Sequence, residues 1–119
     1  IASPAKHKFL QRRQYTRIKF IRDLNLYLTG NQYKISTLDI SAGGMKLTTS
    51  ENIDINASYD VSIPVSEEKF VDCQFQPIRI EKKNGGGYVV SGQFVYKSGH
   101  DKMILTQFCA KRSVEIKNK

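Results

Sequence analysis

Short runs of alternating apolar residues, separated by turn-forming segments, constrain the fold of this chain more than any other feature. In the first run, Leu24, Leu26 and Leu28 alternate with Asn25 and Tyr27, which places the leucines on one face of an extended chain. Alternation of this kind is typical of a strand with one buried face. The sequence predicts six strands, at residues 18–28, 32–38, 45–49, 59–65, 70–80 and 88–96. Glycine-rich or polar segments form the turns and loops between them.

Two of these strands carry a local irregularity. In 70–80 the apolar residues change face at Gln76-Pro77, from Val71, Cys73 and Phe75 to Ile78 and Ile80. Because proline cannot donate to a ladder, we expect a β-bulge at this point. Gly92, within 88–96, predicts a close backbone approach or a strong bend.

A change of period marks the last element. Residues 104, 105, 108 and 109 are apolar, and their spacing is that of an amphipathic helix, which we place at 101–111. Asp101 suits the N-terminus of this helix, and Lys111 and Arg112 suit its C-terminus. At 119 residues the chain has the size of one domain. We therefore predict an all-β fold with one C-terminal helix: a six-stranded antiparallel β-barrel capped by an α-helix.

Positive charge is concentrated at the ends of the chain. The net charge is +8, from 19 Lys and Arg against 11 Asp and Glu. Residues 1–22 hold seven basic residues and no acid, whereas residues 23–110 hold eight basic and ten acidic residues, a net of −2. Such localised charge is typical of an anion-binding segment. We expect a flexible basic arm or linker at 1–11, one domain at 12–112 and a basic tail at 113–119.

Two short motifs carry the chemistry. Arg12, Arg13 and Arg17 bring three guanidinium groups together in a stretch without acids, and guanidinium groups match phosphate oxygens and the O6/N7 edge of guanine. The segment 39–44 (Asp-Ile-Ser-Ala-Gly-Gly) begins 22 residues after Arg17, and we expect it to form a tight turn. Its carboxylate can accept from guanine N1–H and N2–H, and its glycines allow close backbone approach. The two motifs together predict a site for a guanine nucleotide.

The pair of motifs resembles the signature of the PilZ domains, which are receptors for the bacterial second messenger cyclic di-GMP. That signature is Arg-x-x-x-Arg, followed further along the chain by Asp/Asn-x-Ser-x-x-Gly. Here Arg13 and Arg17 match the first half, and Asp39, Ser41 and Gly44 match the second.

The resemblance extends beyond the motifs. The segment 92–94 (Gly-Gln-Phe) is similar to a late Gly-x-Phe strand of the family, and the expected barrel and helix agree with its fold. The similar region spans about residues 9–112. Its layout most resembles the second domain of YcgR-like flagellar-brake proteins.

The resemblance implies a non-catalytic receptor with a defined role for each motif residue. Arg13 and Arg17 would hold the phosphates and guanine O6/N7, and Asp39 would accept from a guanine Watson–Crick edge. Ser41 would donate to a phosphate or fix the turn, and Gly43-Gly44 would leave the surface free of side chains.

The resemblance also bears on stoichiometry and output. In the family, an arginine directly before the Arg-x-x-x-Arg run accompanies an intercalated ligand dimer, so Arg12 implies two cyclic di-GMP molecules per chain. Binding would be transmitted to a neighbouring domain or to a protein partner, such as the flagellar motor or the polysaccharide synthesis machinery.

The sequence carries no apolar run long enough to span a membrane. We expect a cytoplasmic protein, or the cytoplasmic part of a membrane-associated one. Because the chain begins with Ile1 rather than methionine, we also expect a segment of a longer protein, or added residues at its front.

Two other binding functions stay open. A small basic barrel can bind RNA or single-stranded DNA, although such proteins place aromatic side chains on an exposed sheet face. Here most aromatic residues fall on predicted strands at positions consistent with the core. The basic arm could instead bind an anionic membrane surface.

Little in the sequence supports catalysis or a metal site. There is no nucleophile–base constellation, and His7 and His100 have no Cys or acid at ligand spacing. Glu67-Glu68 is expected to be an exposed turn pair. Cys73 and Cys109 are expected to be buried, reduced and used for packing.

Two further residues have open roles. Arg79 lies on a predicted strand and either faces the site or lies outside it. Tyr15 either stacks on a base or braces the arm.

Overall fold

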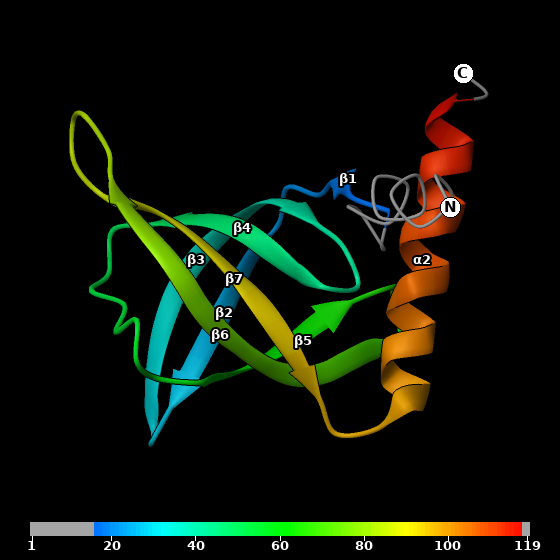
Figure 1. Cartoon of the computed structure of the whole chain (residues 1–119), viewed down its shortest axis with the longest axis horizontal. Coiled ribbons are helices and arrows are strands. Elements are labelled where there is room, and N and C mark those ends of the chain that lie inside the picture. The colour runs from blue at the N-terminus through cyan, green and yellow to red at the C-terminus, as the bar shows by residue number, and fades with distance from the viewer. Residues whose placement is uncertain (1–15, 118–119) are drawn as a thin grey trace, which may run out of the picture.

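The computed structural model of this protein describes residues 16–117 (Figure 1). Strands dominate the first four fifths of this region, and one long helix follows them. The elements are β1 (Ile18–Lys19), β2 (Asp23–Leu28), β3 (Asn31–Ile40), β4 (Gly44–Thr49), β5 (Tyr59–Pro64), β6 (Phe70–Lys82), β7 (Tyr88–Tyr96) and α2 (Gly99–Lys117).

The six longer strands close into an antiparallel barrel, which confirms the predicted fold class. Their hydrogen-bonded order is β3-β2-β5-β6-β7-β4, and a further β3–β4 pairing completes the circle. The weakest seam lies between β2 and β5, which are paired at Tyr27 and Asp60 alone. The short β1 pairs with the end of β3, so that Ile18 lies opposite Ile40 and Lys19 opposite Asp39.

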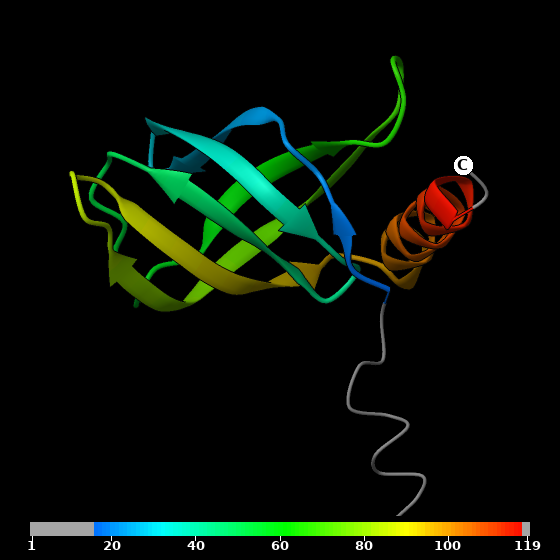
Figure 2. The same cartoon turned by 90° about the horizontal axis from the view of Figure 1, so that it is seen from above.

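The inward side chains of the strands fill the barrel, and α2 covers one of its ends (Figures 1 and 2). Leu105 and Cys109 of α2 are fully buried, and Ile104 and Phe108 pack against the core. The predicted apolar face of the helix is therefore confirmed. Phe108 meets Phe20 edge-on at 5.9 Å between ring centroids, which joins the helix to the segment after β1.

The helix is longer than the 101–111 predicted. Ser98 acts as its N-cap, because the Ser98 hydroxyl accepts from the Asp101 N–H at 3.3 Å. At the other end α2 continues to Lys117, since residues 112–117 contain neither glycine nor proline to stop it.

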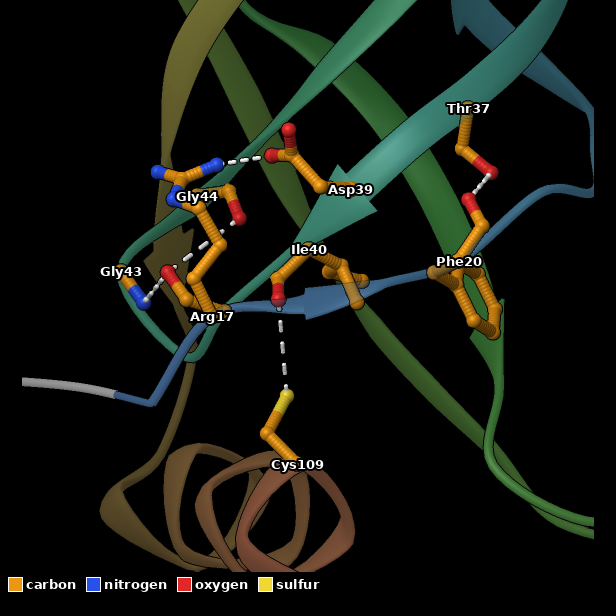
Figure 3. Close-up of polar contacts among 9 residues, drawn as sticks. Arg17, Phe20, Thr37, Asp39, Ile40, Gly43, Gly44 and Cys109 are labelled. Atoms are coloured by element: carbon orange, nitrogen blue, oxygen red, sulfur yellow. Dashed lines mark hydrogen bonds and ion pairs between the residues drawn. The ribbon is translucent and has the colours of Figure 1, made fainter. Parts of the chain in front are cut away.

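The first predicted strand, 18–28, is in fact two strands, β1 and β2. The break is fixed by Thr37, which is fully buried. Its hydroxyl donates to the Phe20 carbonyl at 2.5 Å (Figure 3) and accepts from the Arg22 N–H at 2.9 Å. The Thr37 side chain thus satisfies these two backbone groups, while the Phe20 N–H still donates to the Leu38 carbonyl at 3.1 Å and the Thr37 N–H to the Arg22 carbonyl at 2.8 Å.

The irregularities predicted in the later strands are present. The β6–β7 register shifts between Pro77 and Arg79, so a bulge occurs close to its predicted place. The side-chain assignment there was wrong, however: Pro77 is buried and Ile78 is 60% exposed. Gly92 lies where a Cβ would be 2.3 Å from the Gln76 carbonyl oxygen, so the predicted close approach is confirmed.

Candidate ligand-binding site

Arg17 and Asp39 meet at the end of the barrel where β1 joins β3. The Arg17 guanidinium forms an ion pair with the Asp39 carboxylate across 22 residues of sequence (Figure 3). Their side chains are 41% and 28% exposed, so solvent reaches both partners. Asp39 belongs to β3 rather than to the turn in which the sequence placed it. The strand pairing therefore fixes the position of Asp39, and Arg17, the described arginine of the first motif, lies beside it.

Asp39 is surrounded by cationic side chains. Besides Arg17, its cross-strand neighbours are Lys19 on β1 and Lys46 on β4. Residues directly opposite each other in an antiparallel pair have Cβ atoms about 4.5–5.5 Å apart. Lys19 and Lys46 are both exposed, so this surface offers one carboxylate acceptor within a field of positive charge.

Ser41 holds the turn between β3 and β4. Its backbone N–H donates to the Gly44 carbonyl at 2.8 Å, and the Gly44 N–H returns a bond to the Ser41 carbonyl at 3.3 Å. The buried Ser41 hydroxyl accepts from the Gly43 N–H at 3.1 Å. Of the two roles left open for Ser41, bracing the turn is the one that these contacts describe.

Strand β7 and its last residue anchor the same turn. The Tyr96 hydroxyl donates to the Ala42 carbonyl at 2.5 Å, and the Phe94 N–H donates to the Gly43 carbonyl at 2.9 Å. These bonds involve neither Arg17 nor Asp39, so the turn has a fixed shape of its own. The predicted Gly-x-Phe strand thus contributes directly to the turn.

Gly44 has a structural reason to be glycine. A Cβ at this position would lie 2.0 Å from the Gly92 carbonyl oxygen and 2.9 Å from the Gln93 Cα. Closure of the barrel between β4 and β7 therefore requires glycine at 44, whatever else this surface does.

The helix lies directly beneath the site. The Cys109 thiol donates to the Ile40 carbonyl, with 3.9 Å between sulfur and oxygen (Figure 3). Burial raises the pKa of Cys109 to about 11, although the nearby Arg17 guanidinium opposes the shift. Burial also raises the pKa of Cys73 to about 12. Both thiols are free and buried, as predicted, and neither is a thiolate at neutral pH.

The remaining predicted residues fall into two groups. Arg12, Arg13 and Tyr15 lie outside the described residues. Arg79 is exposed on β6 and forms an ion pair with Glu81 at 3.2 Å. His100 is exposed at the start of α2.

The part of the chain that the structure describes contains neither a candidate metal site nor a membrane-spanning helix. Residues 16–117 contain no group of three or more His, Cys, Asp or Glu side chains that could hold a metal ion. Within the same range, α2 is not apolar enough to cross a membrane.

Comparison with known proteins gives a family and several similar structures. The PilZ domain model matches residues 11–111. The Bacillus subtilis inhibitor of motility MotI/DgrA superposes with a TM-score of 0.73 at 21% identity, over 88% of this chain and 52% of that one. Escherichia coli YcgR in complex with c-di-GMP gives 0.74 at 17% identity, over 90% and 48% of the two chains.

A third structure, the K. pneumonia MrkH–c-di-GMP complex, gives a TM-score of 0.73 at 18% identity, over 91% of this chain and 55% of that one. This chain spans about half the length of these three proteins. No curated protein matches it. The family match over most of the sequence, on a closed barrel with a C-terminal helix, shows that the chain belongs to the PilZ domain family of non-catalytic receptor domains.

Proposed function

We propose that this chain is a receptor domain for cyclic di-GMP, with the ligand held by residues 12–17 and 39–44. The observation that carries the proposal is the ion pair between Arg17, from the first motif, and Asp39, from the second. Two of the similar structures, YcgR and MrkH, are complexes with c-di-GMP, which supports the same ligand here.

The chemistry of the surface suits a cyclic guanine dinucleotide. Arg13 and Arg17 supply guanidinium groups for the phosphates and for guanine O6/N7. The Asp39 carboxylate supplies the acceptor for guanine N1–H and N2–H. Ser41 and the glycines Gly43-Gly44 act by shaping the turn and by keeping it free of bulky side chains.

Arg12 supports a stoichiometry of two ligands per chain. Stacked guanines from two molecules present a second set of phosphates, and a third guanidinium can bind them. The seven basic residues of 1–22 repel one another, so we propose that the arm orders over the ligand when phosphates neutralise that repulsion.

The output is proposed to reach a second domain or a partner protein. The similar proteins are about twice as long as this chain, and their barrels belong to larger architectures. Two of them are YcgR and an inhibitor of motility, which favours control of the flagellar motor over polysaccharide synthesis. A cytoplasmic location, or one on the cytoplasmic part of a membrane-associated protein, follows from this role.

Binding of RNA or single-stranded DNA is less well supported. Such proteins stack bases on exposed aromatic side chains of one sheet face. Among the described aromatic residues, only Tyr27 and Phe70 are exposed, and they lie on β2 and β6, which are not paired with each other. The described region therefore lacks the continuous stacking surface that this function uses.

Isothermal titration calorimetry with cyclic di-GMP tests the proposal. Linear pGpG and GTP serve as controls because they carry the same base without the cyclic backbone. We expect saturable binding of cyclic di-GMP at two molecules per chain and at least tenfold weaker binding of both controls. Absence of cyclic di-GMP binding would reject the receptor function, whereas a ratio of one would reject only the dimer.

A further inference from the structure

We propose that Lys46 is a specificity-determining residue, which together with Asp39 reads the Watson–Crick edge of one guanine. This inference rests on the proposed function, because it concerns the same ligand and the same surface. Lys46 belongs to neither motif, and its position follows from the register of β3 and β4.

The register places the two charged groups next to each other on the outer face of the barrel. Asp39 and Lys46 are directly opposite partners, after a register shift between Thr37 and Asp39. Met45 and Leu47, on either side of Lys46, are fully buried, so Lys46 points outward. Among the described side chains, the ion pairs are Arg17–Asp39 and Arg79–Glu81, which leaves the Lys46 ammonium available to a ligand.

The pair of groups matches guanine and not adenine. The Watson–Crick edge of guanine presents the O6 acceptor beside the N1–H and N2–H donors. A carboxylate accepts from those donors while an adjacent ammonium donates to O6. Adenine presents an amino donor where guanine has O6, so the Lys46 ammonium would face a donor and lose its hydrogen bond.

Lys46 is better placed than Lys19, the other cation beside Asp39. On the far side of Lys46 lies Ser91 of β7, a short and half-buried residue. Lys46 therefore lies in the middle of a paired strand and faces a short side chain across β4 and β7, whereas Lys19 lies on the two-residue strand β1.

Calorimetry with cyclic di-GMP on three variants tests the role of Lys46. Lys46→Met removes the donor and keeps the length of the side chain. Lys46→Gln removes the charge but keeps an N–H donor. Lys83→Met, in the exposed β6–β7 turn, removes one positive charge away from both motifs and is the matched control.

We expect Lys46→Met to weaken binding by roughly 10-fold or more, as for loss of a hydrogen bond from a charged group. Lys46→Gln should recover at least a third of the lost free energy, and Lys83→Met should bind like the wild type. Wild-type affinity in Lys46→Met would overturn the inference. Equal losses of affinity in the Met and Gln variants would also overturn it, because they would show that Lys46 contributes its charge and no hydrogen bond. Either result leaves the receptor function intact, since that depends on binding by the wild-type protein.

Discussion

The Arg17 guanidinium and the Asp39 carboxylate form an ion pair that joins two motifs lying 22 residues apart in the sequence. Both partners are partly exposed, and pairs of this kind contribute only about 0–1 kcal/mol to stability. The main consequence of the contact is positional. It places the Arg17 guanidinium beside the Asp39 carboxylate, which the proposed ligand also needs as a hydrogen-bond acceptor. The two residues should therefore affect ligand binding as a coupled pair.

The first prediction concerns this coupling. Arg17→Ala should weaken cyclic di-GMP binding by roughly 10- to 150-fold, because it removes a charge-assisted bond to the ligand. Asp39→Asn should also weaken binding, and the double variant should lose less than the two single losses combined. Residues in contact typically deviate from additivity by about 0.5–3 kcal/mol. Calorimetry on all four proteins measures the deviation, and strictly additive losses would show that the pair does not act together.

The second prediction concerns Arg12. Arg12→Leu should reduce the number of bound cyclic di-GMP molecules from two to one per chain, because the second molecule loses its guanidinium contact. Lys8→Leu removes a charge from the same arm without touching the motif and should leave the ratio at two. Calorimetry measures the number of cyclic di-GMP molecules bound per chain in both variants. Two bound ligands in Arg12→Leu would contradict the assigned role.

The third prediction separates folding from binding at Gly44. A methyl group there would overlap the Gly92 carbonyl oxygen, so Gly44→Ala should destabilise the barrel by about 1–3 kcal/mol or more. Gly99→Ala is the matched control, because a Cβ at Gly99 has no neighbour within 4 Å. Urea unfolding measures both variants. A native-like midpoint in Gly44→Ala would show that this glycine is needed for something other than closure of the barrel.

The sequence predicted the barrel and the helix because their signals are local. Alternation along β2 and the spacing of Leu105 and Cys109 on α2 both follow from which side chains must be buried. The assignment of Arg17 and Asp39 to one site was also accessible, since their motifs flank a predicted strand pair, but the ion pair between them was not predicted. The six-stranded barrel and the nature of its cap thus needed no tertiary information.

The remaining features depend on contacts between distant residues. The break after β1 arises from the Thr37 hydroxyl, and no local sequence pattern near Phe20 predicts it. Ile78 was grouped with Ile80 on one face because a bulge shifts the alternation by one residue. Periodicity cannot locate a bulge to a single residue, and the register shift lies between Pro77 and Arg79. Lys46 was missed because its link to Asp39 exists only in the β3–β4 register.

The fourth prediction concerns the break between β1 and β2. Thr37→Val removes a buried hydroxyl and leaves the Phe20 carbonyl and the Arg22 N–H without this partner. The free energy of unfolding should fall by about 1–3 kcal/mol. Thr48→Val, on a half-buried position of β4, makes the same change of side chain without a comparable network and should be close to neutral. Equal stability of the two variants in urea unfolding would argue against the assigned role of Thr37.

The last prediction concerns the two buried thiols. Burial raises the pKa of Cys73 to about 12 and that of Cys109 to about 11, from an ordinary value of 9.0. The fold therefore favours the neutral thiols, and this contribution to stability is complete below pH 9. It is lost as the pH rises from about 9 towards 11–12, because unfolded thiols ionise first.

The free energy of unfolding should consequently be insensitive to the thiols between pH 7 and 8.5. From pH 9 to 10 it should fall by up to about 1.4 kcal/mol per pH unit for each thiol. Urea unfolding at half-unit intervals of pH gives the slope, and Cys73→Ala should reduce it because one titrating group is gone. An Ellman reagent assay at pH 8 gives an independent readout, with slow reaction in the native protein and fast reaction in urea. A slope that is unchanged in Cys73→Ala, or rapid native labelling, would mean that the thiols are not shielded as their burial between α2 and the barrel requires.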